Sequence, residues 1–215
     1  MPLDGQFLTN RSTLAMVSDM SRGPDKQFDP EVALARAMEV FWARGYEAAS
    51  LSELLQRMRI GRKSMYDTFG NKRSLFLKTL QYYAQTTILS IRNRLSAPGS
   101  PLKNLKRLLR DLQKEHGVPG SKGCMLGTNI ADFGTADKEM ASVLRSYLKE
   151  VEGAFYEAVL AAQSAGELRK TIDTRALARM LLCMTQGMAL VARVLENETV
   201  LRGTTEAAMS LLEPE

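Results

Sequence analysis

Residues 50–73, SLSELLQRMRIGRKSMYDTFGNKR, decide the fold of this chain. The pattern S-L-S-E, from Ser50 to Glu53, is a capping box and predicts the start of one short helix. A second short helix is expected over about 62–69, after a tight connection. It carries a run of polar side chains: Arg62, Lys63, Ser64, Tyr66 and Asp67. Two short helices in this order are typical of a helix-turn-helix, which places its second helix in the major groove of DNA.

The charge of the chain is concentrated around these two helices. Residues 57–78 hold seven basic side chains against one acidic, a net charge of +6, whereas residues 123–215 hold nine against thirteen, a net charge of −4. A short charged helix is usually a solvated surface. A local cluster of cations, beside helices too short to be stable alone, instead favours contact with phosphates. A further basic stretch, residues 92–122, fits a solvated helix face better.

Helical patterns continue on both sides of the opening stretch. Asp29, Pro30 and Glu31 predict the N-terminus of a helix that ends near Gly45. Asn71 is expected to cap a helix that runs to about residue 95. The spacing of apolar residues predicts further helices, and no strand pattern of useful length occurs; these helices are expected over about 102–117, 137–166, 177–195 and 200–212.

The predicted fold class is therefore all-α, with two domains. Residues 28–76 are expected to form an N-terminal three-helix helix-turn-helix domain that binds DNA. Residues 77–215 are expected to form a C-terminal helical domain. Residues 1–27 mix polar and apolar side chains without a period, which indicates a flexible N-terminal extension.

Composition sets the class of protein. The chain has 215 residues, 45% of them hydrophobic and 25% charged, as in an ordinary soluble globular protein. No apolar run reaches the roughly 18 residues of a membrane span, and no signal peptide is evident, so no membrane partner is expected. The two cysteines, Cys124 and Cys183, lie far apart, which fits a reducing cytoplasm and predicts a cytoplasmic protein.

Catalytic chemistry is not indicated by the sequence. The single histidine, His116, lies at an expected helix end and is interpreted as a surface or capping residue. One histidine and two distant cysteines cannot form a zinc site with ordinary spacing, and no glycine-rich phosphate loop precedes a strand. We therefore expect no catalytic residues, no metal and no cofactor, and we do not expect an enzyme.

Residues 28–76 resemble the DNA-binding domain of the TetR family of one-component regulators. The resemblance rests on F-W-x-x-G-Y at the end of the first helix, on S-L-S-E-L at the start of the second, and on Y-x-x-F-x-x-K from Tyr66 to Lys72. It covers about 50 residues with high specificity. In the more divergent C-terminal half, residues 123–126 and 185–188 look like landmarks of one large subgroup.

The resemblance implies a set of DNA-contacting residues. Arg62, Lys63 and Ser64 would read base edges or nearby phosphates, and Arg or Lys facing guanine is the commonest specific contact. Tyr66 would bond a phosphate, while Ser50 and Lys72 would hold the DNA backbone on either side. The expected set is Ser50, Gly61, Arg62, Lys63, Ser64, Tyr66 and Lys72.

Two positions depart from the family pattern. Arg59 stands where the family usually has the turn glycine. A left-handed backbone there would cost an arginine about 1 kcal/mol, so the turn is expected to be reshaped. Gly61 stands where many members carry a side chain that caps the reading helix, and its bare backbone could approach DNA closely.

For the C-terminal half the resemblance implies a homodimer, built through the last two helices, and a small-molecule effector. A largely apolar pocket is expected between helices. Its candidate lining residues are Cys124, Met125, Phe133, Tyr147, Phe155, Tyr156, Met184 and Met188, and plain core packing is the alternative for each. Lys122 could lower the thiol pKa of Cys124 and make it a redox sensor, whereas a small packing residue is the simpler interpretation.

The leading hypothesis is a sequence-specific transcriptional regulator: a homodimeric repressor that binds a near-palindromic DNA operator and is released by an effector. A helical small-molecule-binding protein or enzyme with a vestigial helix-turn-helix is the alternative. A non-specific architectural DNA binder is a third, which leaves the acidic C-terminal half without a purpose. The sequence names neither the effector nor the operator.

Overall fold

Helices form all the regular structure in the part of the chain that the computed structural model describes, residues 28–133, 137–195 and 198–212. The all-α prediction is confirmed, and the expected extension at residues 1–27 lies outside the described residues. The helices are α1 (Pro30–Arg44), α2 (Leu51–Met58), α3 (Arg62–Phe69), α4 (Lys72–Leu95), α5 (Pro101–His116), α6 (Met125–Phe133), α7 (Lys138–Ser164), α8 (Thr174–Leu195) and α9 (Glu198–Leu211).

Side-chain caps set the starts of the first helices where the sequence predicts them. Asp29 Oδ1 accepts a hydrogen bond from the backbone N–H of Glu31 at 2.8 Å. Ser50 Oγ accepts from Glu53 at 3.1 Å, and Asn71 Oδ1 accepts from Ser74 at 2.9 Å. Each bond satisfies a backbone donor that the first turn of a helix leaves unpaired. The predicted bounds of α3 agree with the structure to the residue.

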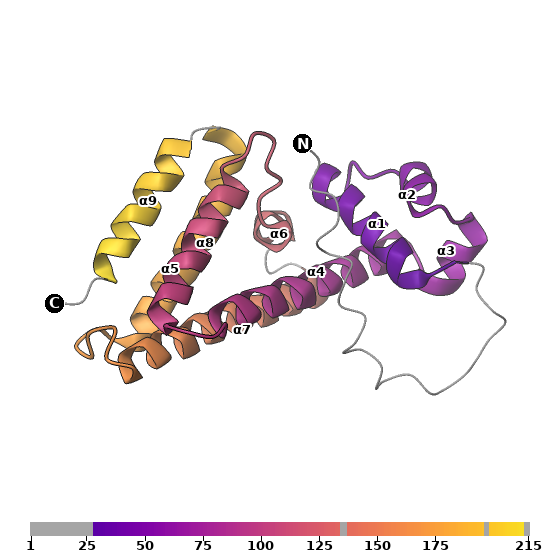
Figure 1. Cartoon of the computed structure of the whole chain (residues 1–215). Coiled ribbons are helices and arrows are strands. Elements are labelled where there is room, and N and C mark those ends of the chain that lie inside the picture. Colours follow the sequence, from indigo (N-terminus) through magenta and orange to yellow (C-terminus); the bar gives the residue numbers. More distant parts are fainter. Residues whose placement is uncertain (1–27, 134–136, 196–197, 213–215) are drawn as a thin grey trace, which may run out of the picture.

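The helices α1 to α3 and the first two turns of α4 pack into one unit, which we call the head (Figure 1). Its core is aromatic: the rings of Phe41 and Phe76 meet edge to face with centroids 4.9 Å apart, and Tyr46 lies 5.0 Å from Phe76. Leu54 and Met65 are fully buried beside them. The core thus fixes α2 and α3 against α1 and α4, the two longer helices.

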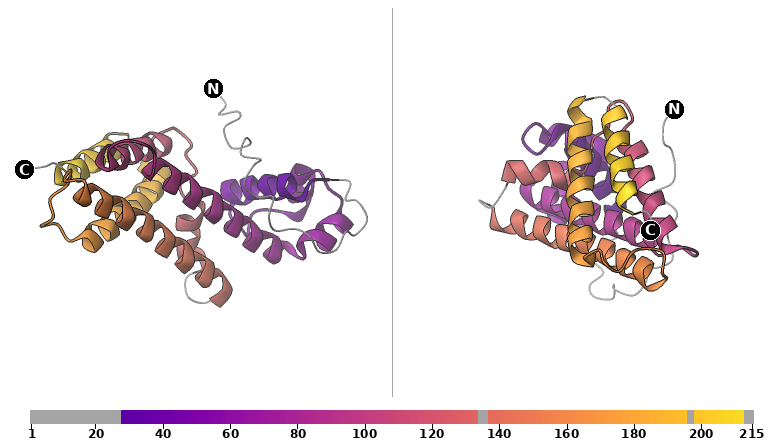
Figure 2. Two further views of the ribbon diagram at one scale, coloured as in Figure 1. Left: turned by 60° about the horizontal axis from the view of Figure 1, so that its bottom comes forward. Right: turned by 90° about the vertical axis from the view of Figure 1, so that its left-hand side faces the viewer.

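The rest of α4 and the helices α5 to α9 form the body. The long helix α4 leaves the head and runs along α7, so a single rigid element belongs to both units (Figure 1). Leu105, Leu108, Phe155 and Leu181 fill the core between α5, α7 and α8. The helices α8 and α9 stand side by side on one face of the body (Figure 2).

The short helix α6 is an element that the sequence did not predict. It has nine residues and contains Gly127, and its N-terminal cap is the sulfur of Cys124, which accepts from the N–H of Gly127 at 3.3 Å. It contacts α4, α7 and α8, so tertiary packing rather than local propensity maintains it. Just before it, Gly123 has φ +66°, and a β-carbon there would lie 2.3 Å from the carbonyl oxygen of Ala189 in α8.

We therefore predict that Gly123→Ala destabilises the protein by about 2–4 kcal/mol, because the methyl group meets the α8 backbone and the left-handed conformation disfavours a side chain. Gly153→Ala is the matched control. Gly153 lies inside α7 with nothing within 4 Å of the added carbon, so this variant should gain about 0.5–1 kcal/mol. Chemical denaturation at equal protomer concentration measures both; equal stability of the two variants would contradict the close approach.

Candidate nucleic-acid interface

The turn between α2 and α3 keeps the left-handed shape that a glycine would adopt. Arg59 has φ 59° and ψ 42° and is the one non-glycine residue with positive φ in the described part of the chain. The N–H of Ile60 then donates to the carbonyl of Leu55 at 3.3 Å, which is the bond between the first and sixth residues of a Schellman motif. The expectation of a reshaped turn is wrong: half-buried Ile60 packs against the core and maintains the turn in spite of the arginine.

The helix α3 presents its charged side to solvent. Arg62, Lys63 and Tyr66 are exposed, with 45% of Tyr66 accessible, while Ser64 is half-buried. Met65 on the opposite side is fully buried. This division gives the helix one anchored face and one face of hydrogen-bond donors, which is what groove binding requires.

Gly61 precedes α3 as its N-cap, with φ −74° and ψ 159° and no side-chain cap bond. Any residue can adopt this extended conformation, and nothing lies within 4 Å of an added β-carbon. The fold therefore does not need a glycine at this position. What the glycine provides is an uncovered backbone at the start of the exposed helix.

Two further predicted contact residues flank α3. Ser50 Oγ is occupied as the cap of α2 but keeps its own proton, and it also lies 3.0 Å from Ser52 Oγ. Lys72 Nζ donates to the carbonyl of Glu47 at 3.2 Å and lies 4.7 Å from the ring centroid of Tyr46. An ammonium has three donors, so this bond fixes the position of Lys72 and leaves two donors for a phosphate.

The structure divides the basic cluster of residues 57–78 into two groups. Lys78 donates to the carbonyl of Thr68 at 3.2 Å, so it satisfies a backbone acceptor at the end of α3. Arg73 is paired with Asp137 and Glu139 of the body. In the described residues, four basic side chains of the cluster form neither an ion pair nor a side-chain hydrogen bond: Arg57, Arg59, Arg62 and Lys63.

The predicted effector residues lie mostly in the packed core. Met184 is half-buried, and the side chain of Phe133 lies outside the described part of the chain. Tyr156 is half-buried and lies under the guanidinium of Arg175, 4.7 Å from its ring centroid. The remaining predicted residues are buried: Cys124, Met125, Tyr147, Phe155 and Met188.

Cys124 lies among hydroxyl groups rather than cations. Its sulfur is 3.6 Å from the hydroxyl of Tyr147 and accepts a hydrogen bond from the N–H of Gly127 at 3.3 Å. Burial raises the pKa of Tyr147 and of neighbouring Tyr83 well above the usual value, so both phenols stay neutral. Lys122, expected beside the thiol, is instead turned to the head.

Lys122 and Gly123 form a contact between the body and α1. The ammonium of Lys122 pairs with the carboxylate of Glu39 and lies 4.8 Å from the ring centroid of Trp42. The indole Nε1 of Trp42 donates to the carbonyl of Gly123 at 3.2 Å. Trp42 is therefore half-buried at a joint between head and body.

A hollow lies between α4 and α7, away from most of the predicted pocket residues. Its volume is about 560 Å³, within the range of small-molecule sites, and of the predicted pocket residues only Tyr147 lines it. Apolar side chains from both helices form part of its wall, with amides, hydroxyls and an arginine–carboxylate pair around them. The lining residues are Gln81, Ala84, Gln85, Ile88, Leu89, Arg92, Ser142, Val143, Ser146, Tyr147 and Glu150.

The helix α8 carries an apolar surface that the monomer leaves open. Leu190 is 55% exposed and Val194 is 79% exposed. Both belong to α8, which stands beside α9 (Figure 2). Within the described ranges, α8 is the helix whose length and composition would suffice to cross a membrane, and 33% of that apolar window is buried. Also within those ranges, no three His, Cys, Asp or Glu side chains gather as metal ligands.

Known proteins match this chain in both parts. The family model of the bacterial regulatory proteins, tetR family, matches residues 33–79, and the tetracyclin repressor-like, C-terminal domain matches residues 101–208. The uncharacterized HTH-type transcriptional regulator YezE of Bacillus subtilis (strain 168) is 34% identical over 198 residues, covering 89% of this chain and 100% of that protein. The HTH-type transcriptional repressor ComR of Escherichia coli (strain K12) is 29% identical, covering 86% and 90%.

Solved structures agree with these relatives. A cysteine mutant of the TetR family transcriptional regulator CifR, complexed with 26-bp double-strand operator DNA, superposes with a TM-score of 0.75 at 27% identity, covering 86% of this chain and 98% of that one. The reduced form of NemR from E. coli superposes with a TM-score of 0.77, over 84% and 95% of the two chains. At 18% identity, NemR supports the fold alone.

The strained turn yields a stability prediction. Arg59→Gly should stabilise the protein by about 1 kcal/mol, because glycine adopts the left-handed conformation without the β-carbon penalty. Arg59→Ala is the matched control: it removes the same exposed charge and keeps the β-carbon, so it should bring no such gain. Urea denaturation of both variants measures the difference, and equal midpoints would mean that the turn carries no strain.

Proposed function

We propose that this chain, which belongs to the TetR family of helix-turn-helix transcriptional regulators, is a homodimeric repressor that a small-molecule effector releases from a near-palindromic operator. The observation that carries the proposal is the exposed face of α3. Arg62 and Lys63 stand there without ion pairs among the described residues, on a helix whose other side is anchored in the head core. Cations kept free of carboxylates are available to DNA.

The contacts follow from this placement. Arg62 and Lys63 are assigned to base edges or adjacent phosphates, with Ser64 beside them and Gly61 allowing the backbone to come close. Tyr66 would donate its exposed hydroxyl to a phosphate. Ser50 and Lys72, at the starts of α2 and α4, would hold the DNA backbone on the two sides of the reading helix. We take residues 28–76 as the DNA-binding domain.

The exposed apolar face of α8 and α9 supports the homodimer. Leu190 and Val194 would be buried against a second copy, because monomers rarely leave such contiguous apolar surface in water. A two-fold axis along this face would place two heads one DNA turn, or a multiple, apart. We assign the face to a second copy rather than to a membrane because it is continuous with α9, an amphipathic helix of the same body.

The effector would bind in the body, among residues 77–215. The candidate lining residues from the sequence remain a proposal; as most are packed, an effector would have to displace core side chains to reach them. Since the relatives are transcriptional regulators, we propose a cytoplasmic, non-catalytic protein without cofactor or metal. For release, the effector must bind the conformation that does not bind DNA more tightly than the one that does.

Binding to DNA tests the proposed interface. The full chain should select a near-palindromic duplex from a random library. Lys63→Ala should then lower the slope of log affinity against log salt by about 1 for each phosphate that a protomer no longer neutralises. Arg62→Ala should cost about 1–3 kcal/mol and relax base preference at one position of each half-site. Fluorescence anisotropy over a salt series measures both effects.

Lys103→Ala is the control for this series, because Lys103 is exposed on α5, far along the chain from the head, and the variant removes the same charge. It should bind with unchanged slope. If the unmodified chain selects no sequence, the repressor proposal fails, and a helical small-molecule-binding protein with a vestigial helix-turn-helix becomes the better interpretation. Equal weakening by Lys63→Ala and Lys103→Ala would point to non-specific charge attraction.

The dimer proposal makes a separate prediction. Val194→Asp should shift the protein from dimer to monomer in light scattering coupled to gel filtration, because it places a charge in the apolar contact. Val32→Asp is the control. Val32 is 38% exposed in the first turn of α1, where an added carboxylate favours the helix. A dimer that survives Val194→Asp would place the interface elsewhere.

A further inference from the structure

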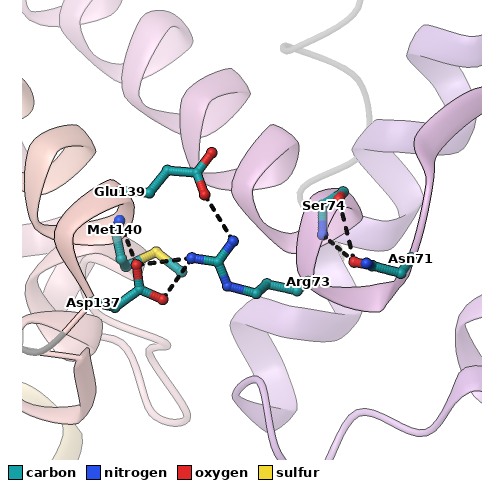
Figure 3. Close-up of polar contacts among 6 residues, drawn as sticks. All are labelled: Asn71, Arg73, Ser74, Asp137, Glu139 and Met140. Atoms are coloured by element: carbon teal, nitrogen blue, oxygen red, sulfur yellow. Dashed lines mark hydrogen bonds and ion pairs between the residues drawn. The ribbon is translucent and has the colours of Figure 1, made fainter.

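Arg73 is held between two carboxylates at the start of α7, as Figure 3 shows. Its Nη2 lies 2.7 Å and 2.8 Å from the two carboxylate oxygens of Asp137, and its Nη1 lies 2.7 Å from Glu139 Oε2. These are short, charge-assisted hydrogen bonds from two nitrogens of one planar group. We call this cluster the Arg73 fork.

Both ends of the fork are fixed to helix starts. Arg73 follows Lys72 in the first turn of α4, where the cap Asn71 accepts from Ser74 (Figure 3). Asp137 is itself the N-cap of α7 and accepts from the N–H of Met140 at 3.1 Å. The guanidinium also holds the pKa of the Asp137 carboxyl below its usual range. The fork therefore joins two rigid elements rather than two mobile side chains.

The fork connects the head to the body. The start of α4 belongs to the head, where Phe76 packs on Phe41, whereas α7 belongs to the body. Apart from the continuous helix α4, the head meets the body at Trp42 and Glu39, which contact Gly123 and Lys122. The fork is a second contact, at the start of α7, whereas Lys122 and Gly123 lie in the loop before α6. Trp42 and Glu39 hold α1 to this loop, and Arg73 holds the start of α4 to α7, so the two contacts together restrict movement of the head on the body.

We infer that Arg73 is a positioning residue for DNA binding: through Asp137 and Glu139 it sets the orientation of the head on the body, and it is not itself a phosphate contact. The inference rests on the proposed repressor function. A two-headed protein binds its operator tightly only if both heads keep the spacing of the half-sites. Each orientation in which the heads are misplaced lowers the binding-competent fraction, and the apparent affinity falls with it.

The fork should contribute to orientation more than to stability. The side chain of Arg73 is 42% exposed, and that of Glu139 is 62% exposed. Exposed ion pairs are screened by solvent and contribute little to the free energy of folding. Variants that break the fork should therefore stay folded, so a change in DNA binding can be separated from unfolding.

Three variants of the full chain test the inference: Arg73→Gln, Asp137→Asn and Glu139→Gln. Asparagine caps a helix as well as aspartate, so Asp137→Asn removes the ion pair and preserves the N-cap of α7. The probe is the duplex that the unmodified chain selects from a random library. Arg73→Gln and Asp137→Asn should each weaken binding by about fivefold to tenfold, with an unchanged salt slope.

The double variant provides the test of coupling. Arg73→Gln combined with Asp137→Asn should bind as Arg73→Gln alone does, because both changes break one interaction. Glu139→Gln, which removes the more exposed of the two ion pairs of the fork, should have a smaller effect. A true phosphate contact predicts the opposite pattern: Arg73→Gln would lower the salt slope by about 1 per protomer and Asp137→Asn would bind as the unmodified chain. That result would overturn the inference.

A second measurement needs no DNA. Trp42 is the single tryptophan of the chain and lies at the other contact between head and body. If the fork fixes the head, Arg73→Gln and Asp137→Asn should both increase acrylamide quenching of Trp42 fluorescence, while Lys103→Ala should not. Unchanged quenching together with unchanged affinity, or an affinity that rises, would refute the positioning role.

The two measurements separate the inference from the proposed function. If the unmodified chain selects no operator, the repressor proposal fails, while Trp42 quenching still shows whether the fork fixes the head. If the chain selects an operator and neither variant changes affinity or quenching, the repressor proposal stands and the positioning role is rejected. Circular dichroism melting of each variant confirms that the fold is intact.

Discussion

The eight residues of α3 cannot keep a helical shape in water by themselves, so the rest of the head must stabilise this helix by packing against it. Burial of Met65 and Phe69 supplies the stability that a helix of two turns lacks. Lys78 of α4 satisfies a carbonyl at its C-terminal end. The charged residues on the outer face are then not needed to stabilise the helix. This face is therefore available for recognition, while the inner face determines the fold.

The connection from head to body runs through few side chains. Trp42 bonds Gly123, and Gly123 in turn lies so close to the backbone of Ala189 that only a glycine fits. Arg73 joins the start of α7. The hollow of about 560 Å³ lies farther along the same two helices, α4 and α7. A group that changed the separation of these helices would therefore act on the fork between Arg73 and Asp137, without touching α1 to α3.

Local signals in the sequence predicted the head well and the body's contacts poorly. Caps such as Ser50 and Asn71 act within three residues, so a single sequence reveals them. The partners of Arg73 lie 64 and 66 residues away, and no pattern near Arg73 distinguishes it from a phosphate-binding arginine. The helix α6 has only a cysteine sulfur as its cap, and neighbours from three other helices maintain it. The prediction for the turn at Arg59 was wrong because tertiary packing overrides a local preference of about 1 kcal/mol.

The joint between Trp42 and Gly123 also limits how far the two halves can be exchanged. A head taken from another regulator would bring a new reading helix and a new operator preference. It would be mounted correctly only if it carried an indole donor for the carbonyl of Gly123 and a guanidinium for Asp137. A grafted head must therefore match the body at both of these side-chain contacts. The choice of a junction point along α4 is not enough.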